Sequence, residues 1–227
     1  MKESLDKSDK VCFEMDLGDP SLLLKVAAGL MDTSGKKLEE YFTSDQYKKI
    51  GKYMRDSMGI DITLFESMKP IALQSVFATS GVNCTNPTSN EDSILKTARN
   101  ANKEITGLET PQEQLTALEH IPIDSIVQQL IDEVQSTEQN DSEYNKLISA
   151  YKKQDLPLLY KLITTSSEPG DEMGVLLEDR NRKWIPRMSD FMNKESVFFA
   201  VGAGHLWGDM GVINLLQKAG YTVKPLK

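Results

Sequence analysis

The stretch FFAVGAGHLWGDMGVINLL, residues 198–216, changes from an apolar run to a helix-like pattern at Gly202 and Gly204. Residues 197–201 are all apolar, which is the pattern of a strand covered on both faces of a sheet. The two glycines allow a sharp exit from that strand, and His205, one of two histidines in the chain, follows them directly. The stretch therefore predicts a buried strand, a turn and a helix.

His205 is thus expected at the carboxyl end of a buried strand, which is the edge where open α/β sheets bind ligands. The following helix start would present free backbone N–H groups to an anion. An imidazole there can bind a metal ion or transfer a proton near neutral pH. The alternative is that His205 makes a hydrogen bond within the turn and that the glycines serve only to reach positive φ. The spacing alone leaves both interpretations open.

Outward from this stretch, strands and helices alternate at both ends of the chain, and the middle is helical. Strands are expected at VCFEMD (11–16), KEITG (103–107) and YTVKPL (221–226). Apolar residues at helical spacing predict helices at 22–31, 44–58, 64–77, 92–103, from 123, at 142–152, 156–164, 168–192 and 210–220. Thr110 and Pro111 suit the cap and first residue of another helix, and Pro186 should kink or break the helix at 168–192. The segment 80–90 is the strongest loop.

This order favours an α/β fold with a mixed or parallel sheet flanked by helices. We expect a single domain, residues 1–227, with a mainly helical insertion at about residues 20–165. A net charge of −8 without a Lys/Arg block argues against nucleic acid or anionic lipid as a partner. No apolar run is long enough for a membrane helix, and the first ten residues lack a signal-peptide core. Cys12 and Cys84 form no CxxC pair, and Cys12 is expected to be a buried small hydrophobe.

Glu14 is a second candidate site residue because it lies near the carboxyl end of the VCFEMD strand. A buried carboxylate there would need a metal ion, a cation or a proton to offset the cost of burying its charge. By strand alternation, however, Cys12, Glu14 and Asp16 share one face, so an ordinary solvated edge is the competing interpretation.

Further candidates lie in LEDRNRKWIPRM (177–188) and in GLET (107–110). Arg180, with Asn181 beside it, can clamp a carboxylate or stabilise an oxyanion. The alternative is that these charges form surface pairs along a helix and that Trp184 packs in the core. Glu109 is either a supporting carboxylate of the site or a charge at a helix start. The sequence contains no GxSxG, HExxH, P-loop or GxGxxG pattern.

Four segments together resemble one family. FFAVGAGHLWGDMGVINLLQKAGYTV (198–223) closely resembles the C-terminal signature of the TraB/GumN/TIKI family, to which metal-dependent proteases are assigned. KSDKVCFEMDL resembles the family's early strand with a glutamate, ITGLETPQEQL its central GLE segment, and LLEDRNRKWIPRM its RN-x-x-W segment. The four occur in the family's order over nearly the whole chain.

The resemblance implies a fold related to the erythromycin-esterase and ChaN-like group, and a site built from two GxxH motifs and a glutamate. Gly202 and His205 match the second GxxH, Glu14 matches the glutamate, and Arg180 with Asn181 matches the RN segment. The first GxxH stands upstream of the glutamate strand in the family and is absent here, so we expect either an N-terminally truncated chain or a degenerate member. We also expect the VCFEM strand to lack a neighbouring strand and to expose an open edge.

The implied function is a hydrolase, most simply a peptidase, that uses a divalent metal such as Mn, Co or Zn. The expected ligands are His205 and Glu14; Glu14 either ligates or acts as general base, and Arg180 stabilises the oxyanion, with Gly202, Gly204, Glu109 and Asn181 as binding or supporting residues. Two matched ligands, where three are usual, predict weak metal binding by this chain. The alternative is a non-catalytic peptide- or ligand-binding protein. A peptide or protein substrate is expected, a homo-oligomer stays open, and the family suggests the cell envelope or secretion.

Overall fold

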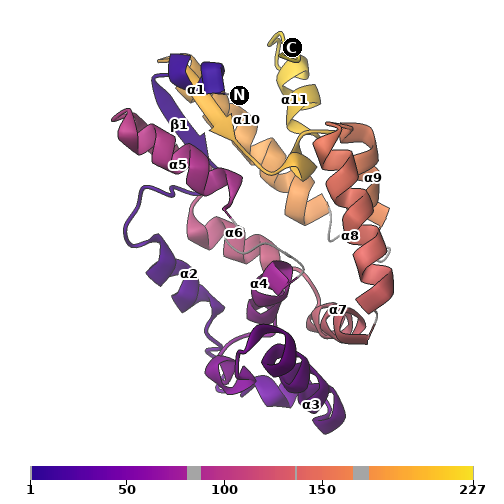
Figure 1. The fold of residues 1–227 in the computed structure, drawn as a ribbon. Coiled ribbons are helices and arrows are strands. Elements are labelled where there is room, and N and C mark those ends of the chain that lie inside the picture. The colour runs from indigo at the N-terminus through magenta and orange to yellow at the C-terminus, as the bar shows by residue number, and fades with distance from the viewer. Residues whose placement is uncertain (1, 81–87, 136, 166–173, 227) are drawn as a thin grey trace. The chain divides into compact units, whose positions relative to one another are not determined.

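The computed structural model describes residues 2–80, 88–135, 137–165 and 174–226. The chain divides into two compact units, each assembled from separate stretches of sequence (Figure 1). Unit 1 comprises Met1–Leu22, Thr88–Ala117 and Leu147–Lys227, and unit 2 comprises Leu23–Pro87 and Leu118–Lys146. The predicted single domain with an insertion at about 20–165 stays a prediction.

Unit 1 holds the sheet and the helices that cover it. Its elements are α1 (Lys2–Lys7), β1 (Lys10–Phe13), α5 (Asn90–Asn100), β2 (Glu104–Gly107), α6 (Pro111–Leu118), α9 (Leu156–Thr165), the π-helical turn η4 (Gly174–Asp179), α10 (Arg180–Met192), β3 (Val197–Ala200), the 3₁₀ turn η5 (Ala203–His205) and α11 (Val212–Lys218). Helix α8 (Thr137–Lys152) has residues in both units.

The sheet has three parallel strands in the order β2-β1-β3. Val11 of β1 lies opposite Ile105 of β2 on one side and opposite Phe198 of β3 on the other. Strand β1 is therefore central, and the prediction that it lacks a neighbour is wrong. Because the strands are parallel, all three end at the same edge of the sheet.

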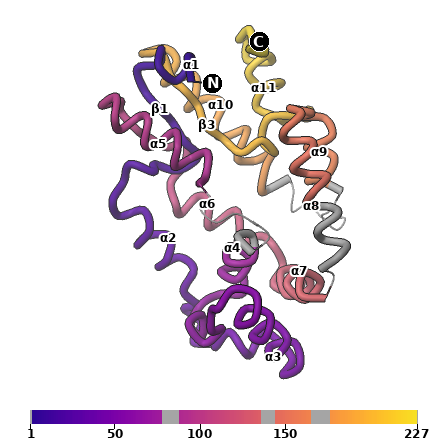
Figure 2. The backbone as a smooth tube through the Cα atoms, in the orientation of Figure 1, coloured from indigo at the N-terminus to yellow at the C-terminus, as the bar shows by residue number. Residues whose placement is uncertain are grey.

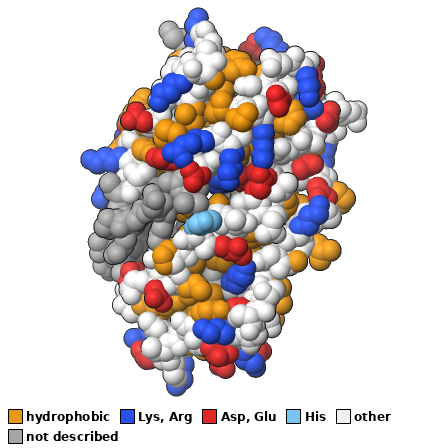
Figure 3. Space-filling model, turned by 180° about the vertical axis from the view of Figure 1, so that it is seen from behind, with side chains coloured by type: hydrophobic (Ala, Val, Ile, Leu, Met, Phe, Trp, Pro, Cys, Tyr) orange, Lys and Arg blue, Asp and Glu red, His pale blue; other side chains and the backbone are white. Residues whose placement is uncertain are grey.

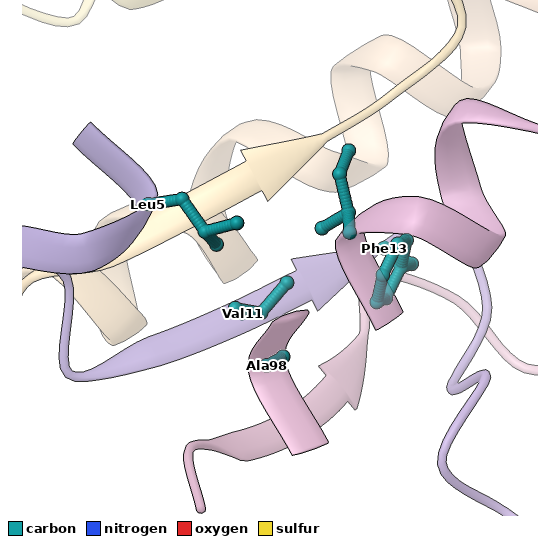
Figure 4. Packing of buried hydrophobic residues seen from close by; sticks show 5 residues of the cluster. Leu5, Val11, Phe13 and Ala98 are labelled. Carbon is teal, nitrogen blue, oxygen red and sulfur yellow. The ribbon is translucent and has the colours of Figure 1, made fainter. Parts of the chain in front are cut away.

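Alternate residues of the strands pack on opposite faces of the sheet. Val11 and Phe13 lie on the face where Ala98 of α5 and Leu5 of α1 are found (Figure 4). Cys12 belongs to a separate cluster with side chains of α10 and α11. The course of these two helices and of β1 can be followed in Figure 2. Both faces are covered, as the continuous apolar runs predict. Cys12 is fully buried, and this burial raises the pKa of its thiol to about 12, so it behaves as the expected small hydrophobe.

Unit 2 consists of helices. They are α2 (Leu22–Leu30), the 3₁₀ turn η1 (Leu38–Tyr41), α3 (Ser44–Tyr53), the π-helical turn η2 (Met54–Met58), the 3₁₀ turn η3 (Ile62–Phe65), α4 (Ile71–Ser80) and α7 (Ile123–Gln135). Helices α3 and α4 both pack against α7. Gly59, with φ of 67°, ends η2, so the helical stretch stops at residue 58, where the predicted helix at 44–58 ends. The helix expected from residue 64 begins only at Ile71, because Pro70 disfavours helical backbone at the residue before it.

Two further expectations are corrected. Residues 221–226, expected as a strand, have no regular secondary structure, although Tyr221 and Val223 are half-buried between exposed neighbours as in a strand. Helix α10 continues through Pro186, so of the predicted kink or break the break does not occur. Burial of Trp184 and Met188 offsets the lost backbone hydrogen bond. Most of the expected loop at 80–90, with Cys84, and the beginning of the predicted helix at 168–192 lie outside the described residues.

Among the described residues, no helix combines the length and apolar character needed to cross a membrane. On the face drawn in Figure 3, basic and acidic side chains alternate with apolar ones instead of gathering into one cationic area.

Candidate functional site

The three parallel strands bring three candidate residues to one edge of the sheet. Glu14 directly follows β1, Glu109 lies two residues after β2, and His205 ends η5, the turn after β3. Arg180 is the first residue of α10. Although Glu14 and His205 are far apart in the sequence, Glu14 Oε1 lies 3.9 Å from His205 Nε2. All of these residues belong to unit 1.

Arg180 is at the centre of the site. Its Nη2 donates to Glu14 Oε2 and to Glu109 Oε1, both at 2.6 Å. Its Nε lies 3.1 and 3.2 Å from the two Glu109 oxygens. Its Nη1 donates to the Leu176 carbonyl at 3.1 Å and lies 3.2 Å from His205 Nε2. Burial alone would lower the pKa of Arg180, but the hydrogen bonds and charges of Glu109 and Glu14 outweigh it, so the guanidinium stays charged.

Glu109 is the most deeply buried carboxylate of the site, with a side chain 4% exposed. Besides Arg180, it accepts from Trp184 Nε1 at 3.0 Å and from Gln114 Nε2 at 3.1 Å. Gln114 also lies within 3.4 Å of Glu14 Oε2. Glu109 therefore accepts hydrogen bonds from three side chains, which a charge at a helix start alone would not require.

The loop that carries Glu109 is itself fixed by an ion pair. Arg187 of α10 donates to the Leu108 carbonyl at 2.5 Å and to Glu113 at 2.6 Å. The hydrogen bond from Arg187 lowers the pKa of Glu113 to about 2, against the opposing effect of burial. Thr110 Oγ1 accepts from the Glu113 backbone N–H at 3.2 Å, as expected of a helix cap. Helix α10 therefore supplies both Arg180, the cation of the site, and Arg187, which anchors the loop that carries Glu109.

The tautomer of His205 follows from its neighbours. Asn181 Nδ2 donates to the carbonyls of His205 and Met210, at 3.2 and 2.8 Å, so its Oδ1 is the atom that faces His205 Nδ1, at 2.7 Å. Nδ1 must then carry the hydrogen, and Nε2 presents its lone pair toward Glu14 and Arg180. The Trp184 ring lies against the imidazole, with centroids 4.4 Å apart.

His205 is neutral at physiological pH. Burial lowers the pKa of its imidazole to about 4; the charge of Glu14 opposes this shift and that of Arg180 adds to it. The same burial that removes the proton leaves Nε2 available as an acceptor or ligand.

The two glycines beside His205 do not serve to reach positive φ, since neither is among the positive-φ residues of the described chain. The Gly202 backbone N–H donates to Glu14 Oε1 at 2.7 Å, and a Cβ at Gly202 would lie only 3.2 Å from that oxygen. A Cβ at Gly204 would meet Ile163 of α9 at 3.3 Å. Gly202 therefore borders the site, and Gly204 faces the helix that packs behind the turn.

Two of these groups have the chemistry of metal ligands, namely the bare Nε2 of His205 and the carboxylate of Glu14. Within the described ranges, however, no group of three or more His, Cys, Asp or Glu side chains is arranged to hold a metal ion. A catalytic divalent ion usually takes three protein ligands. The donors thus fit a metal in type, and a further donor would have to come from water, substrate or protein beyond these residues.

The structure gathers Glu14, Glu109, Arg180, Asn181, Gly202 and His205 around one point and turns Gly204 away from it. Sequence reasoning did not assign Gln114 or Trp184 to the site. Trp184 is one helical turn after Arg180 and therefore on the same face of α10, which is a signal that could have found it. Gln114 carries no comparable signal, since its role depends on how α6 faces the sheet.

Comparison with known proteins matches nearly the whole chain to one sequence family. The sequence model of the TraB/PrgY/gumN family matches residues 1–225. A protein of Amphimedon queenslandica described as "Metalloprotease TIKI homolog" is 32% identical over 98 residues. That match covers 38% of this chain and only 19% of the relative's length. No solved structure is significantly similar to the chain.

Proposed function

Because the chain belongs to the TraB/PrgY/gumN family, we propose that it carries the hydrolytic site of a divalent-metal-dependent enzyme that acts on peptides. The observation that carries this proposal is the 3.9 Å approach of Glu14 Oε1 to the lone pair of His205 Nε2. The likeness to a protein described as a metalloprotease homologue supports it.

His205 and Glu14 are the groups that would hold the metal, and each is preset for that role. Asn181 fixes the His205 tautomer that leaves Nε2 bare, and the Trp184 ring restricts the tilt of the imidazole. Glu14 is oriented by the Gly202 N–H at one oxygen and by Arg180 at the other. When bound, a divalent ion supplies Lewis-acid polarisation of a carbonyl and a water of lowered pKa.

Glu14 is also the group best placed to accept a proton from an attacking water. Its side chain is 24% exposed, whereas that of Glu109 is 4% exposed, so Glu14 is the carboxylate that substrate and water can reach. Glu109 would affect the reaction only indirectly, because it fixes the position of Arg180. Arg180 in turn would stabilise negative charge that develops next to Glu14 and His205.

The test is titration calorimetry with Mn²⁺, Co²⁺ or Zn²⁺ on the wild type and on His205→Ala. The wild type should bind weakly, because it offers two of the three usual protein ligands. His205→Ala should bind at least about tenfold more weakly still, since even partners outside the ligand shell are each worth about 10- to 100-fold. Cleavage of a peptide library in the presence of the metal that binds then tests the reaction.

His120→Ala is the matched control, because His120 is the other histidine, is exposed and lies in unit 2. It should bind metal as the wild type does. Equal binding by wild type and His205→Ala would contradict the ligand role, and metal binding without cleavage of any peptide would contradict the reaction.

A second candidate function, a peptide- or ligand-binding protein without catalysis, is favoured by one observation. Arg180 already forms ion pairs with both Glu14 and Glu109, each at 2.6 Å, so both carboxylates have a cationic partner without a metal. This alternative predicts peptide binding that is unchanged by a chelator and by His205→Ala.

An envelope or secreted location, a peptide partner and the absence of a nucleic-acid partner are part of the same proposal. Fractionation of cells that express the native gene tests the location. Recovery of the protein with the cytosolic fraction would contradict it.

A further inference from the structure

Every donor of the Arg180 guanidinium has an acceptor within the site. A guanidinium has five N–H groups. Nε–H faces Glu109; the two hydrogens of Nη2 reach Glu109 and Glu14; and those of Nη1 reach the Leu176 carbonyl and His205 Nε2. The side chain is 11% exposed. Arg180 is therefore a fully engaged internal cation, and it could contact a substrate only by giving up one of these bonds.

Two of those bonds involve the atoms that a metal ion would need. Nη1 lies 3.2 Å from His205 Nε2, and Nη2 donates to Glu14 Oε2 at 2.6 Å. The neutral imidazole has a single lone pair at Nε2. It can accept from Arg180 or bind a metal ion, but not both at once. The positive charge of Arg180 also repels a second cation at this short distance.

Glu109 restricts the positions that the Arg180 guanidinium can take. It engages Nε and one hydrogen of Nη2, on the side of Arg180 that does not face His205. While Glu109 keeps its hydrogen bond to Nε, Nη1 can leave His205 and Nη2 can leave Glu14. The buried guanidinium then still has a carboxylate partner. Two carboxylates around one guanidinium and a neutral imidazole also leave this cluster with a net charge of −1, which suits an incoming cation.

We propose that Arg180 is the resident cation of the site and competes with a divalent metal ion for His205 Nε2 and Glu14 Oε2. This inference rests on the proposed function, which requires a metal ion at those atoms. Glu109 is the positioning residue of the exchange, because it retains Arg180 when the metal enters. The affinity of the site for metal is thus set by the difference between metal binding and the loss of two Arg180 hydrogen bonds, and not by the ligands alone.

The experiment is calorimetric titration of Mn²⁺ and Zn²⁺ into the wild type and into the double variant Arg180→Met, Glu109→Gln. Methionine is unbranched and can follow the path of the aliphatic part of the arginine side chain. Glutamine keeps a carbonyl oxygen that can accept from Trp184 Nε1. Removing both charges together leaves neither Arg180 nor Glu109 as an unpaired buried charge, and Glu14, which loses the Arg180 hydrogen bond, keeps the one from the Gly202 N–H. The double variant should bind metal at least about tenfold more tightly than the wild type, because the net charge of the cluster stays at −1 while the metal no longer has to displace the Arg180 hydrogen bonds at His205 Nε2 and Glu14 Oε2.

Two controls make the result interpretable. Near-ultraviolet circular dichroism and thermal unfolding establish that the double variant is folded. A triple variant that adds His205→Ala should lose the gain, which would locate the tighter binding at His205 Nε2.

The outcomes separate this inference from the proposed function. Tighter, His205-dependent binding by the double variant supports both. His205-dependent binding by the wild type without any gain in the double variant overturns the competition and leaves the proposed function standing. Absence of metal binding in both proteins overturns both, and a gain that persists in the triple variant overturns the competition because the metal is then bound elsewhere.

Discussion

At the scale of single residues, the site depends on hydrogen-bond donors and acceptors that are matched one to one. Asn181 donates both of its amide hydrogens to carbonyls, and its oxygen accepts from His205 Nδ1. Arg180 uses all five of its N–H donors. None of the described buried side-chain nitrogen or oxygen atoms is left without a partner. Such a network fixes protonation states as well as positions.

The buried neutral state of His205 predicts a pH dependence of stability. Its pKa is lowered from 6.5 to about 4, so below pH 6.5 the unfolded chain takes up a proton that the folded protein does not. This contribution to stability is complete above pH 6.5 and is lost as the pH falls toward 4. The free energy of unfolding should therefore fall by about 2 kcal/mol between pH 7 and pH 5. Urea titrations at both pH values measure it.

His205→Gln is the matched variant for that measurement, because glutamine has no titrating group in this range. The variant should lose less stability than the wild type over the same pH interval. An equal loss in both proteins would show that other groups, and not His205, carry the effect.

We predict that Glu109 also contributes to the stability of the protein, because it is an ion-pair partner of the buried Arg180. Glu109→Ala removes one partner of a buried ion pair, which costs about 3 kcal/mol or more of unfolding free energy. Glu109→Gln should cost less, because it retains an acceptor for Trp184 Nε1. Urea unfolding of the two variants at pH 7 compares them. Equal stabilities of the two variants would contradict the role assigned to the Trp184 hydrogen bond.

The candidate residues could be named from the sequence because ionisable or polar groups at the ends of apolar strands are costly to bury unless they have partners. Glu14 and His205 both follow this rule. The partner of each could not be named, because it depends on rotamers and on the approach of α10 to the sheet. The oxyanion role of Arg180 stays a prediction, but the sequence did not show that all five of its N–H groups already have acceptors, so that such a role would depend on its charge or on release of one of these bonds.

At the scale of elements, strands β1, β2 and β3 were predictable from short apolar or β-branched runs between turn residues. Their order in the sheet was not, because strand pairing is a long-range property that no local pattern contains. For the same reason β1 was expected at an open edge although it is central. Half-buried and exposed residues alternate over 221–224, as they would in a strand. Residues 221–226 nevertheless pair with no strand of the described sheet.

Gly107 marks a close approach between elements, and its substitution tests the fold next to the site. A Cβ at Gly107 would lie 2.4 Å from the backbone nitrogen of Asp16 and 2.7 Å from the carbonyl carbon of Met15. Because these are backbone atoms, Gly107→Ala should shift the segment after Glu14 and destabilise the protein by about 1–3 kcal/mol or more. Thermal and urea unfolding measure the loss.

Gly204→Ala is the control, because its Cβ would meet only side-chain atoms, the end of Ile163 at 3.3 Å and that of Leu177 at 3.8 Å. It should cost less than about 1 kcal/mol, the usual range for a small change that a side chain can absorb. If Gly204→Ala proves as damaging as Gly107→Ala, backbone contact is not what makes Gly107 necessary.

At the scale of the whole molecule, every residue of the site lies in unit 1, although the sequence of unit 2 interrupts it. Unit 2 has its own buried residues, among them Leu38, which is fully buried. Leu38→Ala should therefore lower the unfolding free energy by about 2–5 kcal/mol without changing the metal affinity of the folded protein. Calorimetry below the unfolding transition tests this, and a weaker affinity would show that the site depends on unit 2.

The central claim is that Glu14 and His205 form one cation site despite their separation along the chain. Crystals grown with Mn²⁺ and measured by anomalous diffraction at the manganese edge test it most directly. The account predicts one anomalous peak within bonding distance of both His205 Nε2 and the Glu14 carboxylate, with Arg180 withdrawn toward Glu109. A peak distant from either residue, or none at saturating Mn²⁺, would contradict it.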